Sequence, residues 1–219
     1  MEKINDMHGK VVMVTAGTGG IGKVTATELA KLGARVVVIG RDAQRGRTAL
    51  DDIRAQSGNP NVDLMLADLS SQAEVAHLVM QFRARYDRLH VLVNNIGGVQ
   101  GRRTETVDGI ETTFATTYLN VFLLTSLLLP LLKVSSPSRI VNVNSSVHRM
   151  AKLNFDDLQG RQRYQAPAAY GRAKLANVMF TYELSRRLAG TGVTANCADP
   201  GMADTPGTRA NTRDRKSVV

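Results

Sequence analysis

Tyr170 and Lys174 carry the sharpest chemical signal in the chain. They stand four residues apart in a predicted helix over residues 168–188, so both side chains lie on one face of it. A nearby ammonium group favours the phenolate form, so we expect Lys174 to lower the pKa of Tyr170 towards neutral pH, which suits proton transfer. A tyrosine and a lysine at this spacing also occur on ordinary helix surfaces without a chemical role. The surrounding elements must therefore decide between the two interpretations.

Serine residues stand at the end of the predicted strand that precedes this helix. Residues 139–143 are mostly apolar, and Asn144, Ser145 and Ser146 follow them directly. The carboxyl ends of parallel strands meet at one rim of a sheet, where ligands bind. We therefore expect serine hydroxyls at the same rim as the tyrosine–lysine pair.

A glycine-rich turn near the N-terminus predicts a nucleotide site. An apolar strand over residues 11–14 precedes it, and a helix over residues 23–32 and a strand over residues 35–39 follow. The glycines are Gly17, Gly19, Gly20 and Gly22. In such a βαβ unit the turn allows close approach of a pyrophosphate to the backbone and to a helix N-terminus. A tight turn that binds no ligand would contain similar glycines.

The end of the second strand favours NADP over NAD. An acidic side chain at this place would accept hydrogen bonds from the ribose of NAD, but here Gly40 is followed by Arg41. A guanidinium group binds a phosphate through two parallel hydrogen bonds. The alternative is that Arg41 is an exposed residue at the start of the next helix.

Two further strand ends contain polar residues. Asp68 follows a predicted strand over residues 62–67, and Asn94, Asn95 and Gly97 follow one over residues 89–93. Asp68 suits a ligand at the rim or the N-terminal cap of the next helix. The amides and the glycine suit bracing of the backbone near a ligand, or a turn alone.

The remaining pattern predicts one α/β domain over residues 1–205. Helices are expected over residues 43–56, 73–85 and 109–133, and a sixth strand over residues 193–197. This alternation predicts a Rossmann-type, doubly wound parallel sheet with helices on both faces and the strand order 3-2-1-4-5-6. Residues 206–219 are a polar, basic tail.

Composition narrows the class of protein. The chain has 219 residues, a net charge of +9 and one cysteine, Cys197. The basic residues are mostly dispersed, and no zinc-ligand spacing or aromatic–basic platform accompanies them, so we expect neither a metal site nor a nucleic-acid partner. The longest apolar run, residues 122–132, is interrupted by polar residues and Pro130, and no secretory signal is evident. We therefore expect no membrane span and a cytoplasmic location.

Together these residues resemble the short-chain dehydrogenase/reductase family, within it the retinol dehydrogenase-like, NADP-dependent oxidoreductases. The resemblance covers roughly residues 9–205. Its most specific pieces are Tyr170-Gly-Arg-Ala-Lys174, Asn94-Asn-Ile-Gly97, residues 15–22 and residues 139–145. The segment over residues 174–180 is also typical of that group.

The resemblance implies a role for each matching residue. Tyr170 would be the general acid/base, Lys174 would lower its pKa and hold the nicotinamide ribose, and Ser145 would bind the substrate oxygen, with Ser146 as the alternative. The implied cofactor-binding residues are Gly17, Thr18, Gly20, Ile21, Gly22, Arg41, Asp68, Leu69, Asn95, Gly97, Tyr170, Lys174, Pro200 and Gly201. The expected reaction is hydride transfer between NADP(H) and an alcohol or carbonyl substrate. A homo-oligomer through the long helices is also implied.

Several residues depart from the family pattern. Ala16 replaces the first glycine of the motif, and we expect Gly17 to preserve the turn. Thr117 replaces the proton-relay asparagine, and Asp199 replaces a frequent histidine before Pro200-Gly201. Asn144 takes the first place of the usual serine pair.

The end of the chain suggests a shortened gene product. Family members continue through further helices and a seventh strand, and we expect both to be missing. Residues 214–219 can be encoded by a string that resembles sequencing-adapter DNA, so we expect this tail to be non-native. The alternative hypothesis is accordingly a truncated or degenerate member that binds a nicotinamide dinucleotide without turnover.

Overall fold

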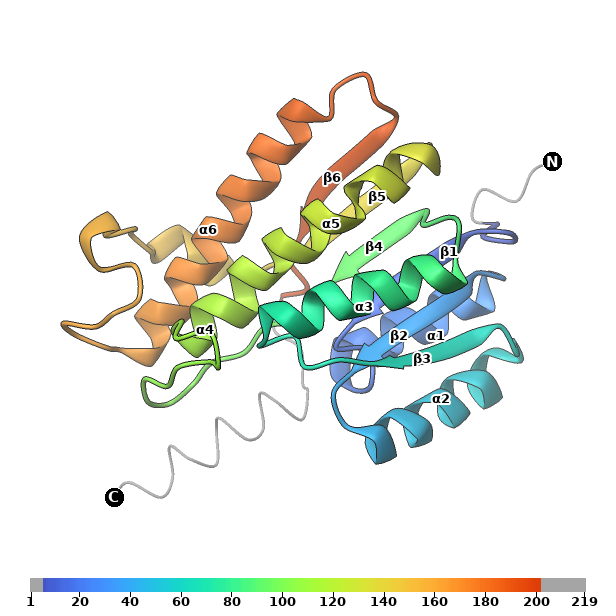
Figure 1. The fold of residues 1–219 in the computed structure, drawn as a ribbon, viewed down its shortest axis with the longest axis horizontal. Helices are drawn as coiled ribbons and strands as arrows, with labels where there is room; N and C mark the ends of the chain where they lie inside the picture. The colour runs from blue at the N-terminus through green and yellow to red at the C-terminus, as the bar shows by residue number, and fades with distance from the viewer. Residues whose placement is uncertain (1–5, 202–219) are drawn as a thin grey trace.

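A twisted sheet of six parallel strands forms the centre of the molecule (Figure 1). The computed structural model describes residues 6–201. The strands are β1 (Val11–Thr15), β2 (Arg35–Gly40), β3 (Val62–Leu66), β4 (Val91–Asn94), β5 (Ser138–Val143) and β6 (Val193–Ala198). Their order, β3-β2-β1-β4-β5-β6, and their parallel pairing confirm the predicted doubly wound fold. The predicted tail and the predicted domain end at residue 205 lie outside the described residues.

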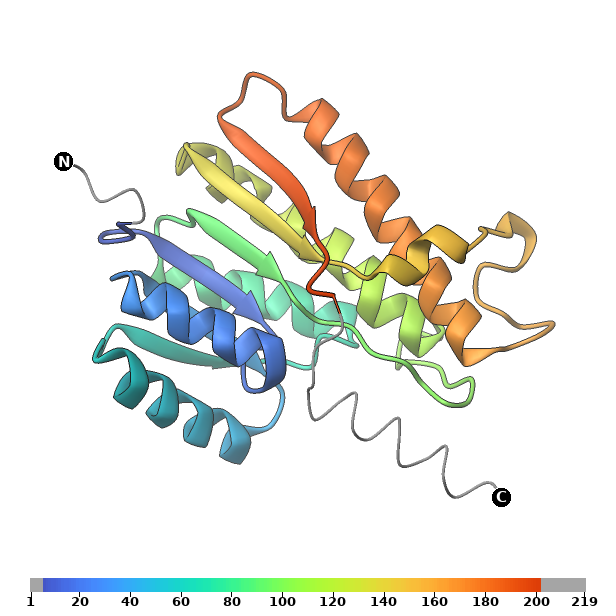
Figure 2. The same cartoon turned by 180° about the vertical axis from the view of Figure 1, so that it is seen from behind.

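Helices cover both faces of this sheet. They are α1 (Gly20–Lys31), α2 (Ala43–Ser57), α3 (Gln72–Arg85), α4 (Thr112–Phe114), α5 (Asn120–Val134) and α6 (Ala166–Arg187). Helices α3, α5 and α6 lie on the face shown in Figure 1, and α1 and α2 lie on the opposite face, shown in Figure 2. A π turn, η1 (Ala115–Leu119), joins α4 to α5, and short 3-10 turns, η2 (Ser146–Met150) and η3 (Phe155–Asp157), follow β5.

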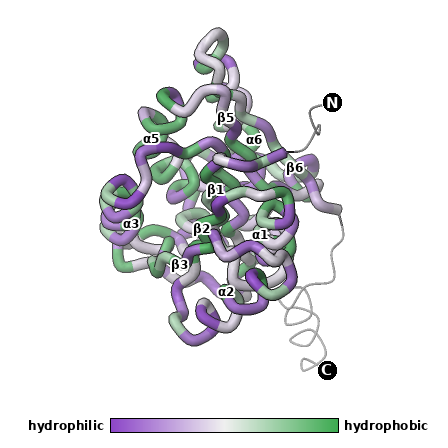
Figure 3. Tube along the Cα trace, turned by 90° about the vertical axis from the view of Figure 1, so that its right-hand side faces the viewer, coloured by the Kyte–Doolittle hydropathy of each residue, from purple (hydrophilic) through white to green (hydrophobic). Residues whose placement is uncertain are grey.

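Alternation within the strands fills two cores, one on each face. Met13, Val37 and Ile39 pack on the side of α3 and α5, whereas Val12 and Val38 pack against α1 and α2. Successive side chains of a strand point to opposite faces. A strand covered on both sides is therefore apolar at every position, as the sequence of β1 and β2 indicated. Figure 3 shows these hydrophobic strands at the centre, with more hydrophilic helices around them.

Several predicted boundaries differ from the observed ones: α1 begins at Gly20 and not at residue 23, and α6 begins at Ala166 and not at residue 168. Two further differences have local reasons. The fourth strand begins at Val91 and not at residue 89, because the N–H of Leu89 donates to the side chain of Ser135 (2.9 Å) and leaves the sheet ladder. The helix predicted from residue 109 begins at Thr112. Gly109 lies in a turn with a φ of 70°, and the carboxylate of Glu111 caps the helix by accepting from Thr113 N and Phe114 N at 2.8 Å.

The longest apolar helix extends beyond the run seen in the sequence. Residues Thr112–Val134 form one helical stretch, which by length and hydropathy (mean 1.7) is able to cross a membrane. Within the protein 44% of its apolar window is buried, and core helices of globular proteins have the same composition. The absence of a membrane span therefore stays a prediction.

Candidate functional site

The glycine-rich turn after β1 is shaped by Ala16, whose φ of 49° is left-handed. A non-glycine residue in this conformation is strained by about 1–2 kcal/mol. The expectation that Gly17 preserves the turn was wrong, because Ala16 itself adopts the unusual conformation. Gly17 instead allows close packing, since a Cβ atom there would lie 2.9 Å from Val38 Cγ1 and 3.0 Å from the main-chain oxygen of Val14.

Asn95 braces this turn from the end of the neighbouring strand. Its Nδ2 donates to the main-chain oxygens of Thr15 and Ala16 at 3.3 Å each, and its N–H donates to Thr15 Oγ1 at 2.9 Å. Gly22, in the first turn of α1, packs against the same atoms. A Cβ atom on Gly22 would lie 2.4 Å from the Ala16 oxygen and 2.5 Å from Asn95 Nδ2. Thr15, Asn95 and Gly22 thus hold the turn in one conformation.

The start of α1 can receive an anion. The helix begins at Gly20, and its N-cap, Gly19, has no side chain to accept from the first N–H groups. Thr18 lies directly before this cap, at the end of the turn. A Cβ atom on Gly19 would meet only the guanidinium of Arg45, at 3.8 Å, among the described residues. The space over the turn is therefore open, and a cation stands beside it.

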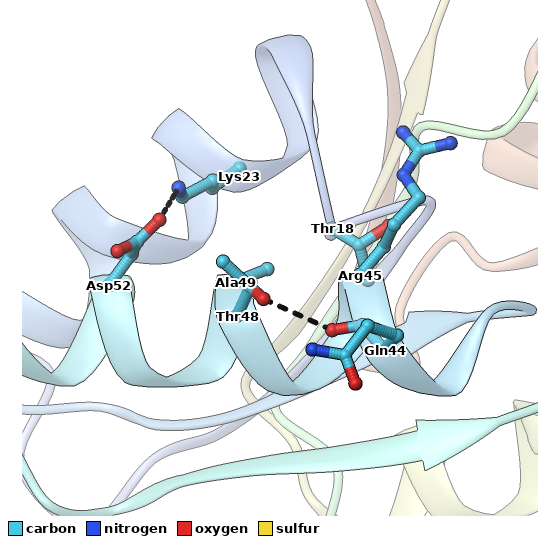
Figure 4. Close-up of a pocket in the computed structure, with 7 residues that line it drawn as sticks. All are labelled: Thr18, Lys23, Gln44, Arg45, Thr48, Ala49 and Asp52. Atoms are coloured by element: carbon cyan, nitrogen blue, oxygen red, sulfur yellow. Dashed lines mark hydrogen bonds and ion pairs between the residues drawn. The ribbon is translucent and has the colours of Figure 1, made fainter.

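Arg45 was not among the predicted residues. It belongs to the first turn of α2, where Asp42 caps the helix by accepting from Arg45 N at 2.8 Å. Figure 4 shows Arg45 and Thr18 at one end of an open pocket of about 230 Å³, with the Lys23–Asp52 ion pair at the other end. Arg41, the predicted phosphate ligand, is exposed directly after β2. Asp42, as a helix cap directly after β2, predicts that Arg45 lies in the first turn of the next helix, and this was the signal that could have identified the second arginine.

The segment after β3 lies at the same rim. Asp68 is exposed and its Oδ1 accepts from Ser70 N at 2.9 Å, whereas Ser71 caps α3. Leu69 is buried, and its main-chain oxygen accepts a hydrogen bond from Asn120 Nδ2 of α5. The position of Asp68 is thus fixed by a local turn and by a contact from a distant helix.

Lys174 and Tyr170 face the ends of β5 and β6. Lys174 is 3% exposed, and its Nζ donates to the main-chain oxygen of Val143 at 2.7 Å. This ammonium lies 5.5 Å from the centre of the Tyr170 ring, which is half-buried. Ser145, at the end of β5, is half-buried and Ser146 is exposed, so the rim of β5 offers Ser145 the more enclosed position.

Asn144 has a bracing role at this rim. It is buried, its Nδ2 donates to the main-chain oxygen of Lys174 at 3.3 Å, and its Oδ1 accepts from Ser145 N at 2.8 Å. Asn144, which stands where the family has the first serine of its pair, therefore joins the end of β5 to α6, the helix that carries Lys174.

Burial shifts the pKa values of both Tyr170 and Lys174. Burial and the charge of Asp199 raise the pKa of Tyr170, and the expectation that Lys174 lowers it was wrong for this structure. The physical reason is that burial of the ring disfavours the charged phenolate, and the Lys174 ammonium does not offset this. Burial lowers the pKa of Lys174 itself to about 8, a fall that the charges of Cys197 and Asp199 partly oppose.

Asp199 reaches this site from the end of β6. Its Oδ1 accepts from Gly201 N at 3.0 Å, and Gly201 has a φ of 68°. Pro200 and Gly201 are exposed after β6. The predicted nicotinamide-binding turn is therefore at the same rim as Lys174, held by the residue that departs from the family pattern.

Gly97 and Thr117 complete the site between Lys174 and the π turn. A Cβ atom on Gly97 would lie 3.4 Å from both Lys174 Nζ and Thr117 Oγ1. Thr117 is fully buried, and its hydroxyl has no hydrogen-bond partner among residues 6–201. The structure thus places the departing residue Thr117 beside the lysine, although a threonine hydroxyl is shorter than the expected asparagine side chain.

These features fit a bound dinucleotide. The glycine turn is open over Gly19, and Arg45 lies beside it. At the other end Lys174 Nζ makes one hydrogen bond within residues 6–201, while an ammonium has three donors. Gly97 leaves space beside Lys174 that a side chain would fill. The remaining donors and the buried Thr117 hydroxyl are free to bind a polar group such as a ribose.

Comparisons with known proteins agree with this geometry. The short chain dehydrogenase profile matches residues 10–216. Mouse retinol dehydrogenase 12 is 46% identical over 194 residues, which are 89% of this chain and 61% of that protein. Human polyprenol dehydrogenase is 43% identical over 202 residues, 90% of this chain and 61% of that protein.

Solved structures give the same result. The NADP complex of Pseudomonas aeruginosa RhlG superposes with a TM-score of 0.78 at 28% identity, covering 99% of this chain and 82% of that one. The chain spans about three fifths of the length of the curated relatives described above. Its profile match, its parallel sheet and its identity to the retinol dehydrogenases lead to one conclusion. The chain belongs to the short-chain dehydrogenase family and is of the retinol dehydrogenase-like type.

Proposed function

We propose that this oxidoreductase transfers a hydride between NADP(H) and a lipophilic alcohol, aldehyde or ketone. The observation that carries the proposal is that Tyr170, Lys174 and Ser145 lie at the rim of the sheet to which the glycine turn also opens. Family membership supports redox chemistry at this rim. The bound nicotinamide would supply or accept the hydride.

Each side chain then has a specific task. Tyr170 O–H donates a proton to the carbonyl oxygen during reduction and accepts it back during oxidation. Ser145 donates a hydrogen bond to the same oxygen and keeps it within reach of the phenol. Lys174 binds the ribose through its remaining donors and so holds the nicotinamide end of the cofactor beside Tyr170.

The preference for NADP is supported by two arginines. Arg41 follows β2 at the place where an acidic residue would bind the ribose of NAD, and Arg45 lies beside the glycine turn. Together they offer a bidentate clamp for the extra phosphate. A carboxylate at position 40 would also be crowded, since a Cβ atom on Gly40 would lie 2.5 Å from Thr18 Cγ2.

The substrate class follows from apolar loop residues and from the names of the relatives. Val107, Met150 and Phe155 are 86%, 85% and 75% exposed on the segments that precede α4 and α6. Such side chains favour apolar ligands. The matched retinol and polyprenol dehydrogenases are named for lipophilic alcohols, so retinoids and prenols belong in the first substrate panel.

Binding without turnover is the second candidate, and Thr117 motivates it. Its buried hydroxyl stands where the family places a longer amide, so a proton relay that requires the amide would be broken. In this second candidate function the cofactor still binds, but hydride transfer to a substrate does not occur. It predicts a nicotinamide dinucleotide that binds with ordinary affinity and a carbonyl panel without turnover.

We extend the proposal to assembly and location. The exposed apolar residues Phe122 of α5 and Met179 and Tyr182 of α6 support a homo-oligomer through these helices. A cytoplasmic location is part of the same proposal. Sedimentation analysis of the purified protein and membrane fractionation of expressing cells test the two points separately.

The decisive experiment is a fluorescence titration with NADPH and NADH, followed by turnover of an alcohol and aldehyde panel. We expect tighter binding of NADPH and reduction of lipophilic aldehydes. Tyr170→Phe should retain NADPH affinity and lose turnover. Equal affinity for both cofactors would contradict the arginine clamp, and full activity of Tyr170→Phe would contradict the assigned general acid. Binding with no turnover in the unmodified protein would favour the second candidate.

A further inference from the structure

A buried asparagine links the helix of Lys174 to the π turn. Asn177 follows Lys174 by three residues on α6, is 1% exposed, and its Nδ2 donates to the main-chain oxygen of Thr117 at 3.5 Å. We propose that Asn177 is a positioning residue, whose amide fixes the π turn against α6 and so sets where Thr117 lies relative to Lys174. This inference rests on the proposed function, because it concerns the same site.

The π turn needs such support. Within it the N–H of Asn120 donates to the main-chain oxygen of Ala115, five residues back, which widens the helix by one residue. Turns of this kind are rare and are found mainly at functional sites, because they disturb the regular hydrogen-bond ladder. The Asn177 amide has one orientation that satisfies the Thr117 carbonyl. With Nδ2 and Oδ1 exchanged, two acceptors would face each other in the core.

Asn177 is itself held by a line of buried polar side chains. Thr181 Oγ1 donates to the main-chain oxygen of Asn177 at 2.7 Å, and Asn142 Nδ2 donates to Thr181 Oγ1 at 2.8 Å. Asn94 Nδ2 in turn donates to Asn142 Oδ1 at 2.8 Å. We call Asn94, Asn142, Thr181 and Asn177 the polar ladder. It runs from the neighbouring strands β4 and β5 through α6 to the π turn.

The site has little space for movement of this turn. Thr117 Oγ1 and Lys174 Nζ both approach the same point beside Gly97, at 3.4 Å. A displacement of the π turn by about 1 Å would therefore change the space in which Lys174 holds the ribose, and misplacements of this size cost up to about 100-fold in rate. The glycine turn is braced by Asn95 and lies on other elements, so cofactor affinity should change little.

Two substitutions at position 177 and a control test this role. Asn177→Leu removes the donor at similar volume, whereas Asn177→Asp keeps the shape and can donate only while its carboxyl is protonated. Thr125→Val removes the buried hydroxyl of α5 that accepts from Asn94 Nδ2 at 3.0 Å. It leaves the bond between Asn94 and Asn142 in place, so the polar ladder stays connected, and Asn142 and Thr181 separate the affected Asn94 from Asn177.

We expect Asn177→Leu to lower kcat about tenfold or more with NADPH affinity within about twofold. Hydrogen exchange of the amides in residues 115–121 should become faster. Thr125→Val should keep kcat within about twofold of the unmodified protein. For Asn177→Asp, the ratio of its kcat to that of the unmodified protein should fall as pH rises and the carboxyl loses its proton. A purely structural role would lower kcat equally in Thr125→Val.

The outcomes separate this inference from the function on which it rests. An unchanged kcat in Asn177→Leu, equal losses in Thr125→Val, or a pH-independent ratio for Asn177→Asp would each overturn it. If the unmodified protein shows no turnover, the proposed function fails and hydrogen exchange decides the inference. Faster exchange confined to residues 115–121 then supports the tether, and unchanged exchange overturns it. If Asn177→Leu does not fold, the isosteric Asn177→Asp provides the same comparison.

Discussion

The two halves of the site are held by different means. Around the glycine turn, steric contact adds to the hydrogen bonds of Asn95, because a Cβ atom on Gly17 or Gly22 would lie 3.0 Å or less from a main-chain oxygen. Around Lys174, position is set by buried polar side chains, with Asn144 and Asn177 each bonded to main-chain oxygens. Steric contact keeps the backbone of the turn rigid. A buried polar network instead holds its side chains by hydrogen bonds, and because the surroundings have a low dielectric constant, the energy of these bonds depends strongly on nearby charges.

The difference also appears in what is left unsatisfied. Within residues 6–201, five side-chain atoms are buried without a hydrogen-bond partner, and all five lie between β4 and the end of α6: Asn94 Oδ1, Thr117 Oγ1, Asn120 Oδ1, Arg172 Nε and Asn177 Oδ1. Buried polar atoms without partners are costly. The half around Lys174 therefore accepts a loss of stability that the half around the glycine turn avoids.

The largest effect is expected from Gly22→Ala, which tests steric bracing. The new Cβ atom would lie 2.4 Å from the Ala16 oxygen, and this oxygen belongs to the main chain. We expect a loss of about 3 kcal/mol or more in the free energy of unfolding and loss of NADPH binding. Urea denaturation and fluorescence titration measure the two. The control is Gly19→Ala, where the nearest atom is the tip of Arg45 at 3.8 Å and the fold should be unchanged.

A smaller effect is expected from Lys174→Met, which tests the charge sensitivity of the other half. The pKa of Lys174 is about 8 in the folded protein and 10.5 in the unfolded chain, so the unfolded chain binds the additional proton between these values. The free energy of unfolding should therefore rise with pH in this window by up to about 1.4 kcal/mol per pH unit. The methionine variant lacks this contribution.

Denaturation from pH 7 to 11 measures this difference. The stability of the unmodified protein relative to Lys174→Met should increase from pH 8 to 10.5 and stay constant below pH 8. Parallel curves over the whole range would contradict the buried, charge-shifted lysine.

Removal of one member of the polar ladder should cost less. Asn94→Leu deletes the donor to Asn142 and Thr125 and leaves both acceptors buried without it. We expect a loss of about 2 kcal/mol in the free energy of unfolding. NADPH affinity should stay within about twofold, because Asn95 still braces the turn. A loss of cofactor binding equal to that of Gly22→Ala would show that the two halves are not held separately.

The smallest effect should come from Ala16→Gly, and it is a gain. Glycine adopts the φ of 49° at this position without a Cβ penalty, although it also makes the unfolded chain more flexible. We expect the free energy of unfolding to increase by about 1 kcal/mol or less. Thermal denaturation measures the change, and Gly17→Ala is the contrasting variant, which should destabilise through contact with Val38.

The sequence by itself determined the fold and the residues available for chemistry. Apolar strands at β1, β2 and β5, the glycines between 17 and 22 and the four-residue spacing of Tyr170 and Lys174 are local patterns. Local patterns set secondary structure, and parallel strands with crossover helices permit few topologies. The strand order and the family were therefore predictable, and the boundaries at Leu89 and Glu111 were not, because side chains far along the chain or in a turn decide them.

Only the tertiary structure decided how these residues act on one another. It gave Ala16 the conformation expected of a glycine and brought Arg45 to the glycine turn. It also buried Tyr170 and placed Asp199 near it, and both effects raise the pKa of Tyr170. It also joined Asn177 to Thr117, which are 60 residues apart in the chain. Burial, electrostatic fields and hydrogen bonds depend on distances in space between residues remote in sequence, and periodicity contains no information on those distances.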